Sequence, residues 1–222
     1  MDMILEFSPL LIKGAGITIV ITLASAVLAL TISFIVGLMR CSRNALIRGI
    51  GLVYLEFFRG TSALVQMFFM FYVLPLLGVS FSPMAAGILA CGLNLGSYGS
   101  EVVRGAIKAI GKPQYEAAYS LNYTYTQLYR YVLIPQALPM MIPPFGNLLI
   151  ELMKLTAVTS LITLTDLTFA AQIVRAQTGL TLEPFVLILV IYFLIASALV
   201  AFVDVLAWRI ARSRGRSLKL EA

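Results

Sequence analysis

The sequence predicts an all-α integral membrane protein, with five transmembrane helices and a polar two-helix loop between the third and the fourth. Hydrophobic residues make up 60% of the 222 residues, whereas charged residues make up 12%. The mean hydropathy is +0.96. This composition is typical of membrane proteins and excludes an ordinary soluble domain. The chain has no histidine, which removes the commonest general base and metal ligand, and no metal site is predicted.

Five segments meet the requirement of about 20 mostly apolar helical residues for crossing a bilayer. They are residues 10–39, 53–77, 83–110, 144–164 and 184–208. The third is the poorest because it contains many small residues. We expect one transmembrane domain over residues 1–222, with the polar loop at residues 111–136. Asp2 and Glu6 precede the first apolar segment, so no cleavable signal peptide is expected.

The distribution of basic residues predicts the orientation of the spans. With the amino terminus outside, eleven basic residues fall on the cytoplasmic side and two, Lys13 and Arg175, fall outside. The eleven are Arg40, Arg43, Arg48, Lys108, Lys112, Arg130, Arg209, Arg212, Arg214, Arg216 and Lys219. The net charge of +6 is therefore explained by topology, and no nucleic-acid partner is expected. The carboxyl terminus and the polar loop are predicted to be cytoplasmic.

The polar loop reads as two short helices joined by an elbow. Pro113 suits the first turn of a helix, and Glu116 is expected near that helix's amino terminus, where the macrodipole favours a carboxylate. Asn122 tolerates the left-handed conformation that ends a helix.

The second helix begins with a capping box, Thr124 to Gln127, and Tyr123 with Leu128 can form a hydrophobic staple. Pro135 is expected to end this helix. Two functions remain open for the loop: a docking element for a soluble partner, or a hairpin that lies on the membrane with its tyrosines at headgroup level.

The loop resembles the EAA loop of ABC importer permeases, whose coupling helices enter a groove on a cytoplasmic ATPase. Glu116, Ala117, Ala118 and Pro135 match that motif, and Asn122 replaces its glycine. The resemblance implies that these residues couple the chain to an ATPase, in a type I ABC importer permease fold.

Three further segments narrow the resemblance to the branch for polar amino acids, which also includes permeases for ectoine-like compatible solutes and for opines. They are FFRGTSALVQMFFMFYVLP at residues 57–75, YGSEVVRGAI at 98–107 and IELMKLTAVTSLITLTDLT at 150–168. Together the motifs cover nearly the whole chain.

Charged and polar groups within the predicted spans need partners or an aqueous wall. Three acid–base pairs have a spacing of three residues and are expected to pair locally or to tie helices together: Glu56 with Arg59, Glu101 with Arg104, and Glu151 with Lys154. Asn94, Tyr98 and Glu101 form a polar stripe on one helix face, which either packs against a neighbouring span or lines the substrate pathway. Asp166 is expected at the outer rim.

These observations predict the membrane-spanning subunit of an ATP-driven bacterial importer for a polar amino acid or a similar zwitterion, in the inner membrane. The chain lacks the P-loop pattern, so it is not expected to be an enzyme or to bind a cofactor; ATP and magnesium belong to the partner. The resemblance implies an ATPase dimer inside and a solute-binding protein outside. Five spans are too few to enclose a pathway, which implies a second permease, identical or different. A secondary transporter or channel is the alternative, with an intramembrane enzyme as a third class.

Overall fold

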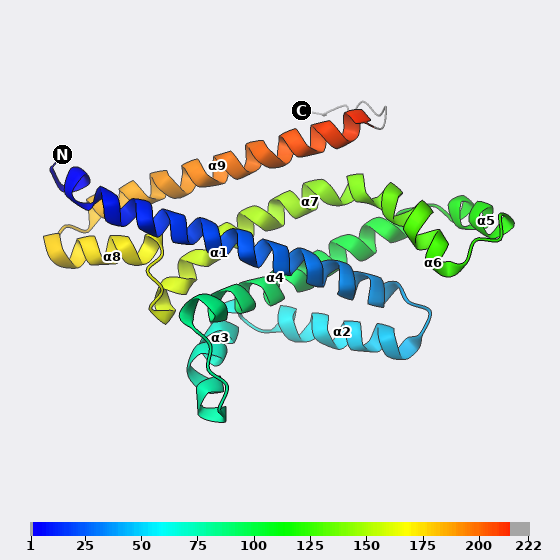
Figure 1. Ribbon diagram of the computed structural model, residues 1–222, viewed down its shortest axis with the longest axis horizontal. Helices are drawn as coiled ribbons and strands as arrows, with labels where there is room; N and C mark the ends of the chain where they lie inside the picture. The colour runs from blue at the N-terminus through cyan, green and yellow to red at the C-terminus, as the bar shows by residue number, and fades with distance from the viewer. Residues whose placement is uncertain (1, 214–222) are drawn as a thin grey trace.

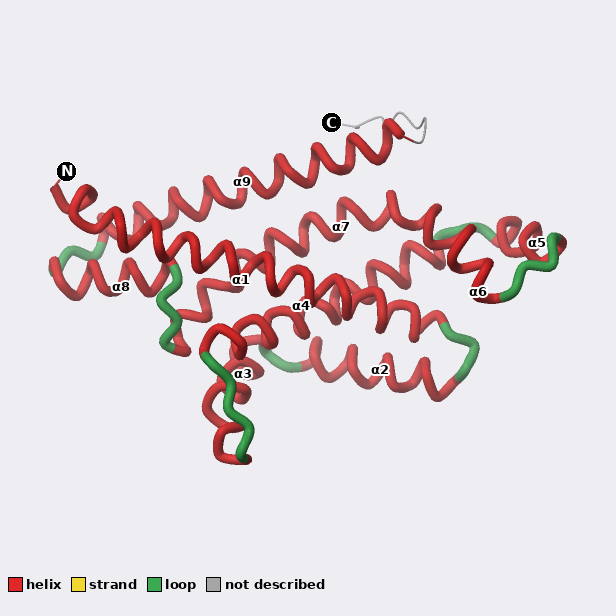
Figure 2. Tube along the Cα trace, viewed as in Figure 1, coloured by secondary structure: helices red, strands yellow, loops and turns green. Residues whose placement is uncertain are grey.

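The computed structural model describes residues 2–213, and this part of the chain is helical with no strand. The main helices are α1 (Asp2–Cys41), α2 (Ala45–Gly60), α3 (Ala63–Phe68), α4 (Pro83–Lys108), α5 (Lys112–Ser120), α6 (Tyr125–Gln127), α7 (Ile134–Leu155), α8 (Leu167–Thr178) and α9 (Leu182–Ser213). Short stretches of 3-10 and π helix extend three of them: Phe69–Val73 and Leu74–Leu77 follow α3, Leu128–Leu133 joins α6 to α7, and Thr156–Ile162 follows α7. Short loops join the rest (Figure 2).

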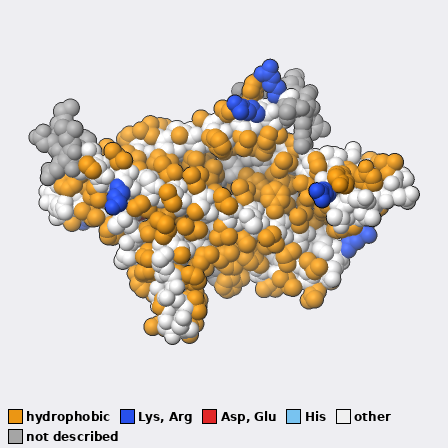
Figure 3. Space-filling view, viewed as in Figure 1, with side chains coloured by type: hydrophobic (Ala, Val, Ile, Leu, Met, Phe, Trp, Pro, Cys, Tyr) orange, Lys and Arg blue, Asp and Glu red, His pale blue; other side chains and the backbone are white. Residues whose placement is uncertain are grey.

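The long helices α1, α4, α7 and α9 run along the long axis of the molecule (Figure 1). The amino terminus and α8 lie at one end, and α5, α6 and the last turns of α9 lie at the other. Hydrophobic side chains cover much of the visible face, with lysine and arginine at the left, at the right and at the top of the view (Figure 3). This surface fits a protein that is surrounded by lipid.

Within residues 2–213, three helical segments are long and apolar enough to cross a membrane: Phe7–Cys41, Tyr125–Ile162 and Leu182–Ile210. The pair α2 and α3 makes a fourth if it counts as one bent span. Helix α4 does not meet the same test, since glycine, serine and charged residues lower its hydropathy. The count of five spans therefore stays a prediction.

Helix α4 lies at the centre because small residues let α1 approach it closely. A Cβ at Gly92 would collide with Leu28 of α1, and a Cβ at Gly96 would collide with Ile32. The Ser33 hydroxyl of α1 also reaches the Gly96 carbonyl oxygen, at 3.3 Å. These glycines therefore permit the close approach of the two helices.

The prediction of one continuous span over residues 53–77 is wrong. The helix stops at Gly60, residues 61–62 are extended, and α3 leaves at 99° to α2. The amide of buried Gln66 makes the break tolerable, because it donates to the carbonyl oxygens of Phe58 (3.0 Å) and Thr61 (3.3 Å). Carbonyls freed by a broken helix need such a partner inside a membrane.

The fourth predicted span begins earlier than residue 144, and Pro135 does not end a helix. A wide π-type turn, Leu128–Leu133, leads directly into α7, and Pro135 occupies the first turn of α7. Helix α8 was not predicted, because it is short and lacks a continuous apolar pattern.

Candidate functional site

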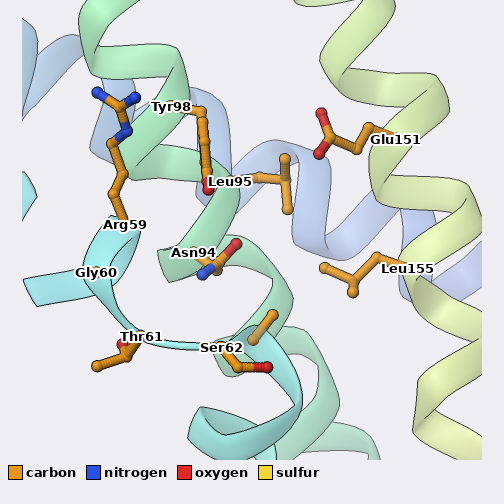
Figure 4. Close-up of a pocket in the computed structure, with 10 residues that line it drawn as sticks. Arg59, Gly60, Thr61, Ser62, Asn94, Leu95, Tyr98, Glu151 and Leu155 are labelled. Atoms are coloured by element: carbon orange, nitrogen blue, oxygen red, sulfur yellow. The ribbon is translucent and has the colours of Figure 1, made fainter.

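A cavity of about 420 Å³ lies where α2 breaks from α3. Its walls come from α2, the break, α4 and α7 (Figure 4). The lining residues are Arg59, Gly60, Thr61, Ser62, Ala63, Asn94, Leu95, Tyr98, Glu151 and Leu155. A cation, a carboxylate, an amide and a phenol therefore face one small cavity, and these four groups come from segments far apart in the sequence.

The polar stripe predicted on α4 is divided between two places. Asn94 and Tyr98 line the cavity, but Glu101 does not. The Asn94 amide donates to the Phe58 carbonyl oxygen at 2.9 Å and to Gln66 Oε1 at 3.3 Å. Asn94 thus supports the broken helix and also forms part of the cavity wall.

Two of the three predicted charge pairs are absent. Among the described residues, Glu56 makes no ion pair with Arg59, and Glu151 makes none with Lys154. Instead, the Arg59 guanidinium lies 5.2 Å from the centroid of the Tyr98 ring, as a cation–π contact. In Figure 4 the Glu151 carboxylate projects from α7 toward α4. The cavity therefore presents one positive and one negative group that do not neutralise each other.

The third predicted pair is present and has a further member. Arg104 donates to Glu101 Oε2 through Nη2 at 2.6 Å and through Nε at 3.1 Å. Arg40, at the end of α1, donates to the other oxygen of Glu101. The local spacing predicted Arg104, whereas Arg40 is 61 positions away and gave no signal in the sequence.

Residues 111–136, the segment predicted to couple to an ATPase and called the coupling segment below, have the predicted elbow. Asn122 has φ of 56°, in the left-handed region. The Thr124 hydroxyl and the Gln127 side chain form both hydrogen bonds of the capping box. Pro113 lies in the first turn of α5, as predicted.

Two details of the coupling segment differ from expectation. Glu116 is the fifth residue of α5 and exposed, so it lies beyond the first turn, where a carboxylate interacts most favourably with the helix dipole. Ala118 is buried in a cluster with Leu128, Leu133 and Val103, so it supports the segment from inside. Ala117 is exposed and is the alanine free to meet a partner.

The end of α1 and the loop after it hold the coupling segment through three tyrosines. The hydroxyls of Tyr125 and Tyr129 donate to the Cys41 carbonyl oxygen, at 3.1 and 3.3 Å. Arg43 donates to the Tyr119 hydroxyl and lies 5.4 Å from the Tyr125 ring centroid. These three tyrosines bind the protein itself, which speaks against a hairpin whose tyrosines mainly serve as headgroup anchors.

Asp166 was expected at the rim, but it is fully buried where α8 packs against α1 and α9. Its Oδ1 accepts the Phe169 N–H at 2.9 Å and so caps α8, whereas Oδ2 has no hydrogen-bond partner among the described residues. Burial raises the pKa of the Asp166 carboxyl from 3.8 to about 6 and outweighs the lowering by the Phe169 N–H.

This shift predicts a pH-dependent stability. The folded protein holds the Asp166 proton more tightly than the unfolded chain, so stability is highest below pH 4 and falls as pH rises toward about 6. The loss is at most roughly 3 kcal/mol. Thermal unfolding in detergent between pH 4 and 7.5 measures it, and Asp166→Asn should flatten the profile. Glu183→Gln, on an exposed residue of α9, is the control; an equal slope in wild type and Asp166→Asn would contradict the assignment.

Comparison with known proteins agrees with this architecture. Residues 29–212 match the family model described as binding-protein-dependent transport system inner membrane component. A probable amino-acid ABC transporter permease of Sinorhizobium fredii is 43% identical over 209 residues, which cover 91% of this chain and 88% of that protein. The crystal structure of an amino acid ABC transporter with histidines has a TM-score of 0.86 and 31% identity, covering 93% and 96% of the two chains. The inward-facing MetNI methionine ABC transporter shares the fold, with a TM-score of 0.78 and 20% identity over 90% and 96% of the chains.

The chain belongs to the family of inner membrane components of binding-protein-dependent transport systems. It is thus a membrane-spanning ABC permease of the type I importer fold. Family membership decides for the importer over the secondary transporter or channel, and it describes a non-catalytic subunit.

Proposed function

We propose that this permease imports an amino acid, and that the cavity at the α2–α3 break binds both the carboxylate and the ammonium group of this substrate. The observation that carries the proposal is the pair of opposite charges, Arg59 and Glu151, on the walls of one cavity without an ion pair between them. The Arg59 guanidinium matches an α-carboxylate, and the Glu151 carboxylate matches an α-ammonium group. Asn94 and Tyr98 add neutral polar groups to the cavity wall.

The relatives support the same substrate class. The Sinorhizobium fredii protein is a probable amino-acid permease, and the solved transporter was crystallised with histidines. Ectoine-like solutes and opines carry both charges as well, so the cavity chemistry alone favours zwitterions as a class. We place amino acids first because both relatives are amino-acid transporters.

The family also supports the partners. We propose that a cytoplasmic ATPase dimer, which binds ATP and Mg²⁺, docks on the coupling segment through Glu116 and Ala117, with Asn122 and Pro135 shaping the segment and Ala118 packing it from inside. A second permease and an extracytoplasmic solute-binding protein complete the importer. The chain itself binds no cofactor in this proposal.

The importer activity is tested by reconstituting the chain with its ATPase and binding protein in liposomes. ATP-dependent uptake is measured for the common amino acids, for ectoine and for an uncharged sugar as control. We expect uptake of at least one amino acid and none of the sugar. Uptake of the sugar, or of a solute with a single charge in preference to every amino acid, would contradict the proposal.

We further propose that the amino terminus faces outside and the coupling segment faces the cytoplasm, in a bacterial inner membrane. Basic side chains of α1, α2, α4 and the coupling segment support this orientation. A cysteine at Thr181, in the exposed α8–α9 loop, should react with an impermeant thiol reagent added outside, whereas one at exposed Leu121 should not. The two native cysteines, Cys41 and Cys91, are free thiols and are first replaced by serine. Reaction at both positions, or at Leu121 alone, would overturn this orientation.

A further inference from the structure

We propose that residues 40–43, at the end of α1 and in the loop that follows it, form a connector that transmits movement of the coupling segment to α4 and so to the cavity. This inference rests on the proposed function, because it needs an ATPase that moves the coupling segment. The connector is hydrogen-bonded to α4 through Arg40, and to the coupling segment through Cys41 and Arg43. It therefore lies between the site where ATP acts and the helix that carries Asn94 and Tyr98.

The bond to α4 is ionic and sheltered. Arg40 donates to Glu101, and the Arg40 side chain is only 11% exposed. The position of Arg40 is restricted further by α2, because a Cβ at Gly51 would collide with Arg40 Cγ. Glu101 is also held by Arg104 of its own helix. Movement of Arg40 therefore pulls on a carboxylate that is firmly attached to α4.

Glu101 stands one turn along α4 from Tyr98, and Asn94 follows one turn further. A helix transmits displacement along its axis with little loss, since its turns are hydrogen-bonded to one another. A shift or rotation at Glu101 thus reaches Asn94 and Tyr98, which both line the cavity.

The bond to the coupling segment consists of three tyrosines from both of its helices. Tyr125 and Tyr129 donate to the Cys41 carbonyl oxygen, one of the last carbonyls of α1, which lack partners within the helix. Tyr119 of α5 is bound by Arg43. These hydrogen bonds are directional, so they fix how α1 is oriented on the segment.

A second connection exists through the apolar cluster that Ala118 and Leu128 share with Val103 and Ile107 of α4. This cluster keeps the segment attached to α4 when the polar bonds are removed. Variants of the connector should therefore fold and bind the ATPase. In these variants, however, ATP hydrolysis should no longer respond to the solute-loaded binding protein. Loss of coordination without loss of assembly is a readout that a merely structural role would not give.

The test uses the reconstituted importer with the solute-binding protein loaded with the solute selected by the uptake screen. Because the solute is taken from that screen, an incorrect amino-acid assignment does not affect this experiment. The variants are Arg40→Gln, which cuts the bond to α4, and Tyr125→Phe with Tyr129→Phe, which removes only the two hydroxyls. Tyr131→Phe removes an exposed tyrosine hydroxyl of the same segment and serves as the matched control.

We expect unchanged ATPase co-purification and basal ATP hydrolysis in all variants. Stimulation of hydrolysis by the loaded binding protein should fall about fivefold or more in Arg40→Gln and in the double tyrosine variant, and not in Tyr131→Phe. Combining Arg40→Gln with the two tyrosine substitutions should lower the stimulation little further, because all of them interrupt the same connection. Arg40→Lys, which keeps the charge, should restore most of the stimulation.

Three results would overturn the connector. The first is full stimulation in either Arg40→Gln or the double tyrosine variant. The second is a combined loss equal to the product of the separate losses, which would show independent effects. The third is loss of ATPase co-purification in the double tyrosine variant, which would place these hydroxyls in docking or folding instead.

Discussion

Replacing Gly96 with leucine is expected to separate α1 from α4 and to leave little folded protein. Even a Cβ at position 96 would collide with the Ile32 side chain, and the Ala29 carbonyl oxygen lies close by. Overpacking of a tight contact costs roughly 1–3 kcal/mol, and leucine adds far more than one carbon, so we expect the upper end or beyond. The melting temperature and the yield of monodisperse protein in detergent measure the effect.

Gly105→Leu is the matched control on the same helix. Gly105 is exposed, and a Cβ there would meet no atom within 4 Å. We expect it to leave the melting temperature almost unchanged. Equal tolerance of leucine at positions 96 and 105 would show that α1 and α4 do not pack as described.

Neutralising either charge of the cavity is expected to abolish most uptake. Arg59→Gln removes the cation proposed for the substrate carboxylate, and Glu151→Gln removes the carboxylate proposed for its ammonium group. A hydrogen bond to a charged group contributes about 1.5–3 kcal/mol, which is roughly 10- to 150-fold in affinity. Initial uptake rates over a range of substrate concentrations should show this as a raised KM.

Glu56→Gln and Lys154→Gln are the controls for this prediction. Each neutralises a charge three positions from Arg59 or Glu151 on the same helix, and neither residue lines the cavity. Both should keep near-normal uptake. A similar loss in these controls would show that net charge, and not the cavity, causes the effect.

The features predicted correctly from the sequence are those set by near neighbours in the chain. The capping box at Thr124 depends on Gln127 three residues later, and the left-handed Asn122 follows from its own side chain. Glu101 and Arg104 pair because helical residues three apart share a face. Each of these needs only the local backbone.

The features that were missed depend on contacts across the fold. The bond from Arg40 to Glu101 and the burial of Ala118 exist only once α1, α4 and the coupling segment are assembled. The grouping of Arg59 with Glu151 likewise needs three helices in place. Local pairing of Arg59 with Glu56 was the simpler expectation, and the cation–π contact with Tyr98 replaced it.

The break at residues 61–62 was missed for a different reason. Gly60 and Ser62 are residues that commonly end and begin helices, so a signal was present. Hydropathy over a window of about 20 residues averages across such a short interruption. The buried Gln66, a polar residue within an apolar segment, was the second sign of the break.

The central claim, that Arg59 binds a substrate carboxylate and Glu151 an ammonium group, is tested most directly by equilibrium binding of analogues to the purified importer. The imported amino acid is compared with its decarboxylated amine and its N-acetylated acid, in wild type, Arg59→Gln and Glu151→Gln. We expect wild type to bind both analogues weakly. Arg59→Gln should no longer distinguish the amino acid from the amine, and Glu151→Gln should no longer distinguish it from the N-acetylated acid. Full discrimination against both analogues in both variants would contradict it.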